Sequence, residues 1–238
     1  LYLDSRDVSL TPHLVLDGFW EEWITRAMTK VVRRGMRVVD VGANVGYYST
    51  LFASLVGESG FVHAFEPVPR LHELLFRNME INGFMARSRC HAAEVHAHRG
   101  LMRFQRFERH LASSSLFATD AHAHAFQDRL QTIDVKSISL DEALSDDPRV
   151  DLLKVDAEGA EPFVLQGARE VLRASPSIHI FLEFAPTFYA STQSPAEVLE
   201  QIRALGLRIQ KIDTNGTTRE TTDKELLAGP WHELYLSR

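Results

Sequence analysis

Residues 38–49 read Val38-Val39-Asp40-Val41-Gly42-Ala43-Asn44-Val45-Gly46-Tyr47-Tyr48-Ser49. Three β-branched residues and one acid precede a glycine turn, and an apolar helical pattern follows it. A strand that runs into a tight turn and a helix N-terminus is a common place to hold a nucleotide-like ligand, because backbone N–H groups point outward there. Glycine lets the backbone approach such a ligand without a Cβ in the way. The segment therefore predicts a ligand site between a buried strand and the helix after it.

The spacing of the two glycines narrows the class of ligand. A dinucleotide fold requires G-x-G-x-x-G, and a phosphate-binding Walker loop requires G-x-x-x-x-G-K-[ST]. The turn reads Gly-Ala-Asn-Val-Gly from Gly42 to Gly46 and fits neither pattern. It therefore excludes a typical dehydrogenase or NTPase loop.

Length and composition indicate a globular α/β protein. The 238 residues suit one domain, or one domain with a small appendage, and the apolar share of 45% and charged share of 24% are ordinary. The net charge of −6 argues against a nucleic-acid partner. The single cysteine, Cys90, excludes an internal disulfide and favours a reducing, cytoplasmic location. No apolar run is long enough for a membrane span. The start at Leu1 leaves open a domain of a longer multidomain polypeptide, and a homodimer is also left open.

The order of apolar patterns predicts a mostly parallel seven-stranded sheet with helices on both faces. The first 12 residues resemble a short strand or arm. An amphipathic helix should begin at Gly18, with Phe19, Trp23, Ala27 and Val31 on one face, and end at Gly35. Strands are expected at 36–41, 61–65, 89–93, 150–155, 178–184, 207–212 and 232–236, and further helices at 46–56, 70–82, 162–174 and 195–205.

The middle of the chain departs from this rhythm. Residues 101–107 and 131–138 alternate in the manner of exposed antiparallel strands, and 108–129 between them is expected to be a loop or short helix. An insert of this length is typical of a lid over a ligand site. We therefore expect a cofactor domain over 36–238 with a lid-like insert at about 94–139, and an N-terminal arm and helix over 1–35 on the acceptor side.

Two further motifs lie at the ends of expected strands. The first is His63-Ala64-Phe65-Glu66-Pro67, which places an acid where a ribose diol would be held. The second is Leu153-Lys154-Val155-Asp156-Ala157-Glu158-Gly159-Ala160-Glu161. With the glycine turn, this combination resembles the FkbM family of class I S-adenosylmethionine (AdoMet) methyltransferases, whose hallmarks include an E-P after strand two and K-[IV]-D-x-E-G-x-E after strand four. The resemblance implies a Rossmann-like class I methyltransferase fold, and it covers roughly Gly18 to the C-terminus.

The resemblance also implies roles for individual residues. Gly42, Asn44 and Gly46 would shape the turn around the methionine part of AdoMet, and Asp40 would fix that turn or meet the ligand's ammonium. Glu66, followed by Pro67, would take the ribose. The remaining positions are the adenine neighbours Ala93 and Glu94, and the cleft residues Asp156 and Glu158, where methyl group and acceptor would meet.

Methyl transfer from a sulfonium is an in-line displacement, so the protein mainly aligns the reactants. A hydroxyl acceptor also needs a general base or a metal to help remove its proton. Asp156 or Glu158 is the preferred base, and Lys154 shares their strand face and would tune one of them. The other candidate carboxylates are Glu161 and Glu183. A divalent metal on Asp156, Glu158 and Glu183 is the less favoured reading, because carboxylate clusters are common without metals.

Structural readings compete with these functional ones. The glycine turn could be only a tight turn, Glu66 a surface acid, and Asp156 or Glu158 a cap of the next helix. Ser113–Ser115 fits a flexible loop tip better than a contact to the cofactor carboxylate. Trp20 and Trp23 fit helix packing, with stacking on a sugar as the alternative. Irregular spacing favours packed or solvated side chains over metal ligands for the histidines at 91, 96, 98, 110, 122 and 124, although one could still serve as the base.

The leading function is an AdoMet-dependent O-methyltransferase acting on a hydroxyl of a sugar, glycan or glycosylated metabolite. FkbM-type enzymes mostly methylate hydroxyls of sugars, glycolipids or natural products such as macrolides. A methyltransferase acting on a polyketide or peptide natural product, or on nitrogen, is the first alternative. A non-catalytic AdoMet-binding or scaffold module is the second.

Overall fold

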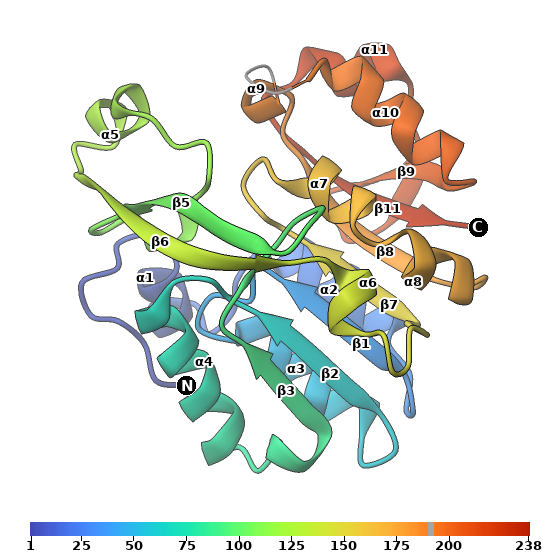
Figure 1. Cartoon of the computed structure of the whole chain (residues 1–238), viewed down its shortest axis with the longest axis horizontal. Coiled ribbons are helices and arrows are strands. Elements are labelled where there is room, and N and C mark those ends of the chain that lie inside the picture. The colour runs from blue at the N-terminus through green and yellow to red at the C-terminus, as the bar shows by residue number, and fades with distance from the viewer. Residues whose placement is uncertain (190–192) are drawn as a thin grey trace.

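The computed structural model describes residues 1–189 and 193–238. Two sheets and the helices around them make up the fold (Figure 1). The strands are β1 (Arg37–Val41), β2 (Phe61–Phe65), β3 (Ser88–His91), β4 (Glu94–Val95), β5 (Gly100–Phe107), β6 (Leu130–Ile138), β7 (Leu152–Val155), β8 (His179–Phe184), β9 (Arg208–Ile212), β10 (Thr218–Glu220) and β11 (His232–Ser237). The helices are α1 (Thr11–Leu16), α2 (Glu22–Val31), α3 (Tyr47–Val56), α4 (Pro69–Ile81), α5 (Asp120–Ala125), α6 (Leu140–Ala143), α7 (Glu161–Gln166), α8 (Arg169–Ala174), α9 (Pro186–Tyr189), α10 (Pro195–Ala204) and α11 (Asp223–Ala228), with 3-10 turns η1 (Met85–Arg87) and η2 (Leu111–Ser113).

The large sheet has the order β10-β9-β11-β8-β7-β1-β2-β3. Strand β1 pairs in parallel with β2 and β7, and β11 lies antiparallel between β8 and β9. The mostly parallel sheet is therefore confirmed, but it has eight strands where the sequence predicts seven. The extra strand, β10, is three exposed residues at the sheet edge, so it carries no apolar pattern to reveal it.

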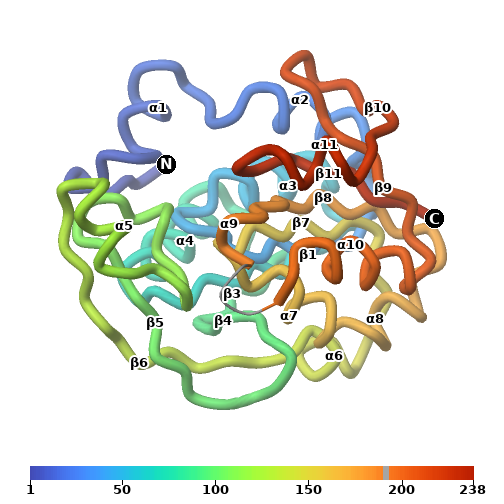
Figure 2. Tube along the Cα trace, turned by 90° about the horizontal axis from the view of Figure 1, so that it is seen from above, coloured from blue at the N-terminus to red at the C-terminus, as the bar shows by residue number. Residues whose placement is uncertain are grey.

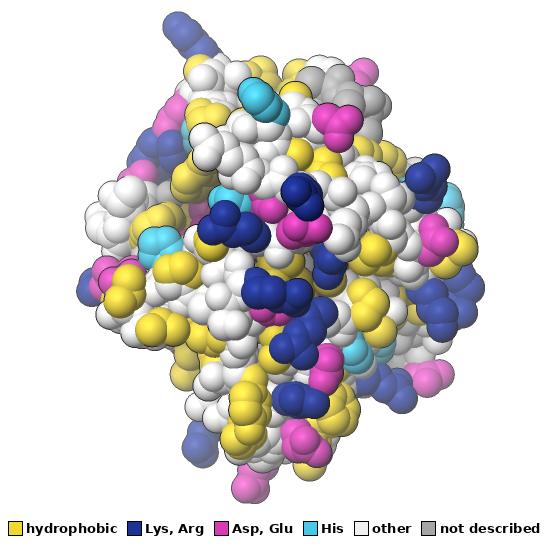
Figure 3. Space-filling view, turned by 90° about the vertical axis from the view of Figure 1, so that its left-hand side faces the viewer, with side chains coloured by type: hydrophobic (Ala, Val, Ile, Leu, Met, Phe, Trp, Pro, Cys, Tyr) yellow, Lys and Arg dark blue, Asp and Glu magenta, His cyan; other side chains and the backbone are white. Residues whose placement is uncertain are grey.

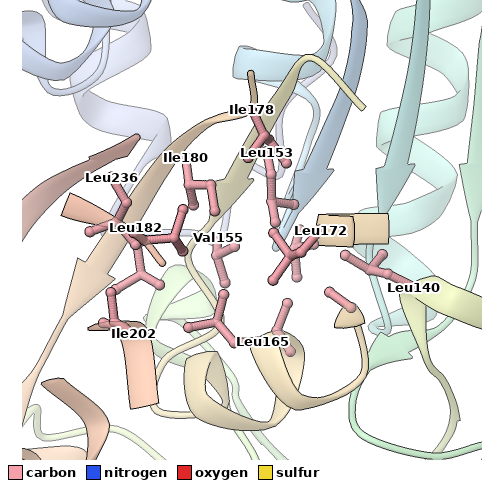
Figure 4. Packing of buried hydrophobic residues seen from close by; sticks show 14 of the residues in the cluster. Leu140, Leu153, Val155, Leu165, Leu172, Ile178, Ile180, Leu182, Ile202 and Leu236 are labelled. Carbon is pink, nitrogen blue, oxygen red and sulfur yellow. The ribbon is translucent and has the colours of Figure 1, made fainter. Parts of the chain in front are cut away.

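Helices cover both faces of this sheet, as predicted. Along β1 the side chains alternate between the two cores: Val39 and Val41 face one, and Val38 faces the other. The first core packs β7, β8 and β11 against α7, α8 and α10, and Figure 4 shows Leu172 beside Leu153 and Leu165 beside Val155. The second core packs the sheet against α2 and α3. Burial on both faces explains why the strand segments read as continuous apolar runs.

The insert forms its own small sheet, β4-β6-β5, beside the carboxyl ends of the large one (Figure 1). Strands β5 and β6 pair antiparallel from Gly100–Ser137 to Phe107–Leu130, as the alternation predicts. A third apolar cluster joins this sheet to the N-terminal segment, with Leu10 packed near Phe104 and Leu111. The insert is thus tied to the first residues of the chain.

Several predicted boundaries are wrong. Residues 1–10 form no strand, which leaves the arm as the correct alternative, and the helix α1 that follows was not expected. Helix α2 begins at Glu22 and buries Ile24, Ala27 and Met28, where the sequence predicts a face led by Phe19. The expected helix over 162–174 is two helices, because the carbonyl of Gly167 accepts from Asp141 N (2.9 Å) at the break. Tertiary packing overrides local periodicity in both cases.

Gly42 has a φ of +73° and brings β1's end against the loop after β7, where an added Cβ would lie 1.8 Å from the carbonyl oxygen of Asp156. Gly83 has a nearly identical φ of +71°, with no atom within 4 Å of an added Cβ. We expect Gly83→Ala to lower the free energy of unfolding only by the cost of the backbone conformation, about 1–3 kcal/mol. Gly42→Ala should lower it clearly more, because the clash adds to that cost. Urea unfolding of both variants measures the difference, and equal losses would contradict the proposed close approach.

Candidate functional site

A cleft lies at the carboxyl ends of β1, β2, β7 and β8. Figure 2 shows the backbone of the N-terminal segment, the insert and the C-terminal part of the chain around these strands. It holds about 890 Å³ of space, partly open to solvent. The lining includes most of the predicted site residues: Gly42, Asn44, Glu66, Pro67, Glu94, Lys154, Asp156, Glu158 and Glu183. Among the described residues, the lining does not include Asp40, Gly46, Ala93 or Glu161.

The glycine turn closes by hydrogen bonds to the neighbouring strand. Gly42 N and Ala43 N both donate to Phe65 O, at 3.1 and 2.9 Å. Asn44 has a φ of +50°, which asparagine tolerates better than most residues. Gly46 begins α3 with a φ of +88°, behind the cleft wall. Gly46 therefore shapes the turn without lining the cleft.

Glu66 is buried, and it connects the turn to the end of β2. Its Oε2 accepts from Asn44 N (2.9 Å) and its Oε1 accepts from Val68 N (2.8 Å). Burial raises the pKa of this carboxyl to about 7, and the two backbone donors work in the opposite direction. Each carboxylate oxygen has a second lone pair, so Glu66 can still accept from a ligand.

Lys154 connects the two loops beneath the cleft. Its Nζ lies 3.1 Å from Asp156 Oδ2 and 3.6 Å from Asp40 Oδ1. Burial opposes its charge, but Asp156 and Asp40 raise the pKa of the ammonium above its usual value. Asp40 is fully buried and also accepts from Ser49 Oγ at 2.5 Å. Asp40 therefore contacts Lys154, which lines the cleft, without lining the cleft itself.

Three carboxylates meet at the far side of the cleft. One oxygen each from Asp156, Glu158 and Glu183 lies within 4.8 Å of the others. Burial, followed by the charge of Asp156, raises the pKa of Glu158 well above its usual value, and burial with the charge of Glu158 does the same to Glu183. Glu158 has a φ of +49°, an uncommon conformation for a glutamate. These three side chains come from the ends of two strands, and they are the residues named for the less favoured metal reading.

Glu161 has a different role from the one considered for it. Its carboxylate accepts from Ala157 N (2.8 Å) and Gly159 N (3.0 Å), so it holds the loop that carries Glu158. The competing reading, in which Asp156 or Glu158 only caps the next helix, is wrong: α7 begins at Glu161 with no side-chain cap.

Two positions were expected near the end of the third strand. Ala93 lies after β3 and does not line the cleft. Glu94 does line it and is buried, with no hydrogen-bond partner for Oε1 in the described part of the chain. Burial raises the pKa of Glu94 well above its usual value, helped by the charge of Glu66.

The opposite wall includes residues that sequence reasoning missed. Glu21 has a φ of +43°, and its Oε2 accepts from Tyr48 OH (3.2 Å). Burial, with the charge of Asp156, raises the pKa of Glu21 to about 7. The sequence offered no signal for this role, because Glu21 lies in the expected amphipathic helix but outside its apolar face of Phe19, Trp23, Ala27 and Val31. Trp20 and Tyr47 complete this wall.

Hydrogen bonds fasten the N-terminal segment to the insert. Asp7 accepts from Thr11 N (2.7 Å) within its own turn and from Leu111 N (3.3 Å) of η2. Val8 N donates to Arg109 O (2.9 Å). The two segments expected to form the acceptor side and the lid are therefore one connected wall.

The serines and histidines of the insert have structural contacts. The expected flexible tip at Ser113–Ser115 is wrong, because Ser115 exchanges backbone hydrogen bonds with Gln105 and Ser114 is buried. His91 stacks on Phe65 at 4.1 Å, and His110 bonds to Asp128 at 3.0 Å. The one candidate metal group found in residues 1–189 and 193–238 contains no histidine.

The surface view of Figure 3, which faces the insert side, shows Lys and Arg side chains interspersed with Asp and Glu. Arg70, for example, lies between Asp4 and Glu73.

No helix in the described residues has the length and apolar character needed to cross a membrane.

Solved structures identify the class of fold. A methyltransferase FkbM from Methylobacillus flagellatus matches with a TM-score of 0.52 and 15% identity, over 91% of this chain and 50% of that one. A precorrin-6y C5,15-methyltransferase from Geobacter metallireducens matches with a TM-score of 0.50 and 12% identity, over 92% and 89%. The doubly wound sheet with its cleft at the strand ends is the class I, Rossmann-like methyltransferase fold, as the sequence predicts.

The family is more specific. Residues 40–209, most of the chain, match the family described as the methyltransferase FkbM domain. The chain belongs to this family of AdoMet-dependent methyltransferases, which confirms the resemblance drawn from the motifs.

Curated relatives share only a short stretch. The protein-L-isoaspartate O-methyltransferase of Methanothrix thermoacetophila is 45% identical over 49 residues, 21% of this chain and 23% of the relative. That of Aeropyrum pernix is 46% identical over 50 residues, 21% and 19%. The chain thus spans less than a quarter of the length of these relatives. The acceptor given in their names is therefore stated of those proteins alone.

Proposed function

We propose that this protein is an AdoMet-dependent O-methyltransferase whose acceptor is a hydroxyl of a carbohydrate or glycosylated metabolite. The observation that carries the proposal is the pair Asp156 and Glu158, which share one cleft with the glycine turn and Glu66. The residues proposed to bind the cofactor and those proposed to accept the proton therefore line the same cleft. The single cysteine supports a reducing, cytoplasmic setting.

The cofactor would lie along the ends of β1 and β2. The turn from Gly42 to Asn44 would pack against the methionine part, and Glu66 would accept from the ribose hydroxyls with its free lone pairs. Glu94, with its unpartnered Oε1, is the adenine neighbour we favour over Ala93. Asp40 would act through Lys154.

In the transfer, an acceptor oxygen attacks the methyl carbon, the C–S bond breaks, and its electron pair stays on sulfur. The hydroxyl proton must pass to a base. Glu158 is the preferred base, because it lines the cleft and burial raises its pKa, whereas Asp156 forms an ion pair with Lys154. Asp156, paired with Lys154 at 3.1 Å, would orient the acceptor hydroxyl.

The acceptor side is expected to be the N-terminal wall. Trp20, Tyr47 and Tyr48 offer aromatic surface on which a sugar ring can stack, and Glu21 offers a carboxylate for its hydroxyls. This wall belongs to the segment 1–35 proposed as the acceptor side, and the attached insert is proposed as a lid. A polyketide or peptide natural product is the alternative acceptor, and a screen with labelled AdoMet separates the two.

Changing Asp156→Asn and Glu158→Gln should abolish turnover while leaving AdoMet affinity largely intact. The loss should be about 10²–10⁴-fold for the base, because that is the usual contribution of a positioned proton acceptor. Methyl transfer to an acceptor found in the screen, and titration calorimetry with AdoMet, measure the two effects. Normal methylation by both variants would remove the catalytic assignment. Absence of AdoMet binding by the unaltered protein at millimolar concentration would remove the proposed function.

AdoMet affinity should depend on pH through Glu66. Its carboxyl must be ionised to accept from both ribose hydroxyls, and its pKa is raised to about 7. Affinity should therefore fall as the pH drops through this value, by up to about tenfold per pH unit. Glu66→Gln should bind AdoMet weakly at every pH and lose this pH dependence. The variant keeps Glu21 and Glu161, whose pKa values are also raised to about 7, so a lost pH dependence is attributable to Glu66. Calorimetry at about pH 6 and 8 tests this, and an unchanged slope in the variant would reject the ribose role.

A further inference from the structure

We propose that Asp156, Glu158 and Glu183 form a binding site for a divalent cation of the Mg²⁺ or Mn²⁺ type. The sequence alone does not favour this reading. Its use in catalysis rests on the proposed function, whereas the binding itself does not.

The positions of the ligand atoms suit a small cation. One carboxylate oxygen from each residue lies within 4.8 Å of the other two. Mg²⁺ binds oxygen at about 2.0–2.1 Å in an octahedron, so two oxygens on opposite sides of it are about 4.2 Å apart. The three oxygens thus need only small side-chain adjustments to share one ion. They lie on two adjacent segments, the loop after β7 and the end of β8.

A separate observation indicates a missing partner. Glu183 Oε2 is buried, and it has no hydrogen-bond partner in the described part of the chain. A buried carboxylate oxygen without a donor costs free energy, so such atoms are normally paired or bind a metal. Glu183 also lies directly opposite Glu233 in the β8–β11 register, where like charges destabilise a sheet. A positive charge beside Glu183 would therefore stabilise both its unpaired oxygen and its position opposite Glu233.

The nearby lysine does not supply that charge. Lys154 Nζ pairs with Asp156 and Asp40. In the described residues, no ion pair joins a cation to Glu158 or Glu183. A divalent ion would neutralise both glutamates at once. All donors in the cluster are carboxylates, which Mg²⁺ and Mn²⁺ prefer over the nitrogen and sulfur ligands typical of zinc.

The cation would change how the acceptor loses its proton. Three protein oxygens leave open coordination positions, and a hydroxyl bound there becomes more acidic because the ion stabilises its oxyanion. Each carboxylate needs only one oxygen for the ion, so the second oxygen of Glu158 stays available to take the proton. Oxygen then attacks the methyl carbon as before. Neighbouring sugar hydroxyls could occupy two of the open positions.

The test uses Mn²⁺ alone, added to the full chain after treatment with a chelator and followed by electron paramagnetic resonance and calorimetry. We expect one bound Mn²⁺ per chain, displaced by Mg²⁺. Glu183→Gln should weaken Mn²⁺ binding by about tenfold or more, since even lost supporting contacts cost metal sites that much. Its AdoMet affinity should be unchanged, which also reports that the variant is folded.

Glu21→Gln is the matched control. It removes another carboxylate of the same cleft whose oxygens are not part of the three-residue group. Mn²⁺ affinity should stay within about twofold of the unaltered protein if coordination, rather than net charge, holds the ion. Equal losses in Glu21→Gln and Glu183→Gln, or no Mn²⁺ binding at millimolar concentration, would overturn the site. AdoMet binding without Mn²⁺ binding would remove only the cation site, and Mn²⁺ binding without AdoMet binding would remove only the proposed function.

Discussion

A buried ammonium shared by two strands organises this molecule. Lys154 on β7 reaches Asp40 on β1 and Asp156 just beyond its own strand, at 3.6 and 3.1 Å. Burying a charge is costly unless partners surround it, so the three groups depend on one another. Their arrangement holds the two central strand ends at one spacing, and both halves of the cleft are built on those ends.

The close approach at Gly42 acts in the same place. Its Cα hydrogen faces the carbonyl of Asp156, so the glycine turn and the acidic loop behave as one rigid unit. Non-glycine residues with positive φ also gather here: Glu21, Asn44 and Glu158 all line the cleft. Uncommon backbone conformations persist where the surrounding structure imposes them, and they are frequent at functional sites. The uncommon backbone conformations of this cleft are therefore imposed by the packing around it.

An excess of negative charge follows from this construction. Lys154 forms ion pairs with both Asp40 and Asp156. Within the described residues, no cation forms an ion pair with Glu158 or Glu183. AdoMet itself is a cation, and a divalent ion would supply further positive charge near the acceptor. Repulsion among the carboxylates raises the pKa of Glu158 and Glu183 beyond the effect of burial, which suits groups that exchange protons or bind metals.

Much of the fold could be predicted, because buried parallel strands and their helices follow short-range apolar patterns. The glycine turn, Glu66 and the run from Lys154 to Glu158 could be recognised for the same reason: each depends on residues close in the chain. Contacts with residues distant in sequence determine the β10 edge strand, the break at Gly167 and the start of α2. These features could therefore not be predicted from local patterns. The acceptor-side position of segment 1–35 was expected, but Glu21 was not singled out, since its place in the cleft depends on tertiary contacts such as the hydrogen bond from Tyr48 OH.

The amino-acid order alone thus determines the doubly wound sheet, the family and the position of the glycine turn and Glu66, because these use local motifs with fixed spacing. The three-dimensional arrangement was needed to separate Glu161, which holds its loop, from Glu158, which faces the cleft. It was also needed to bring Glu183 from β8 beside Asp156 and to leave its Oε2 without a partner. Burial and charge compensation depend on every element packed around a group, and no local pattern records them.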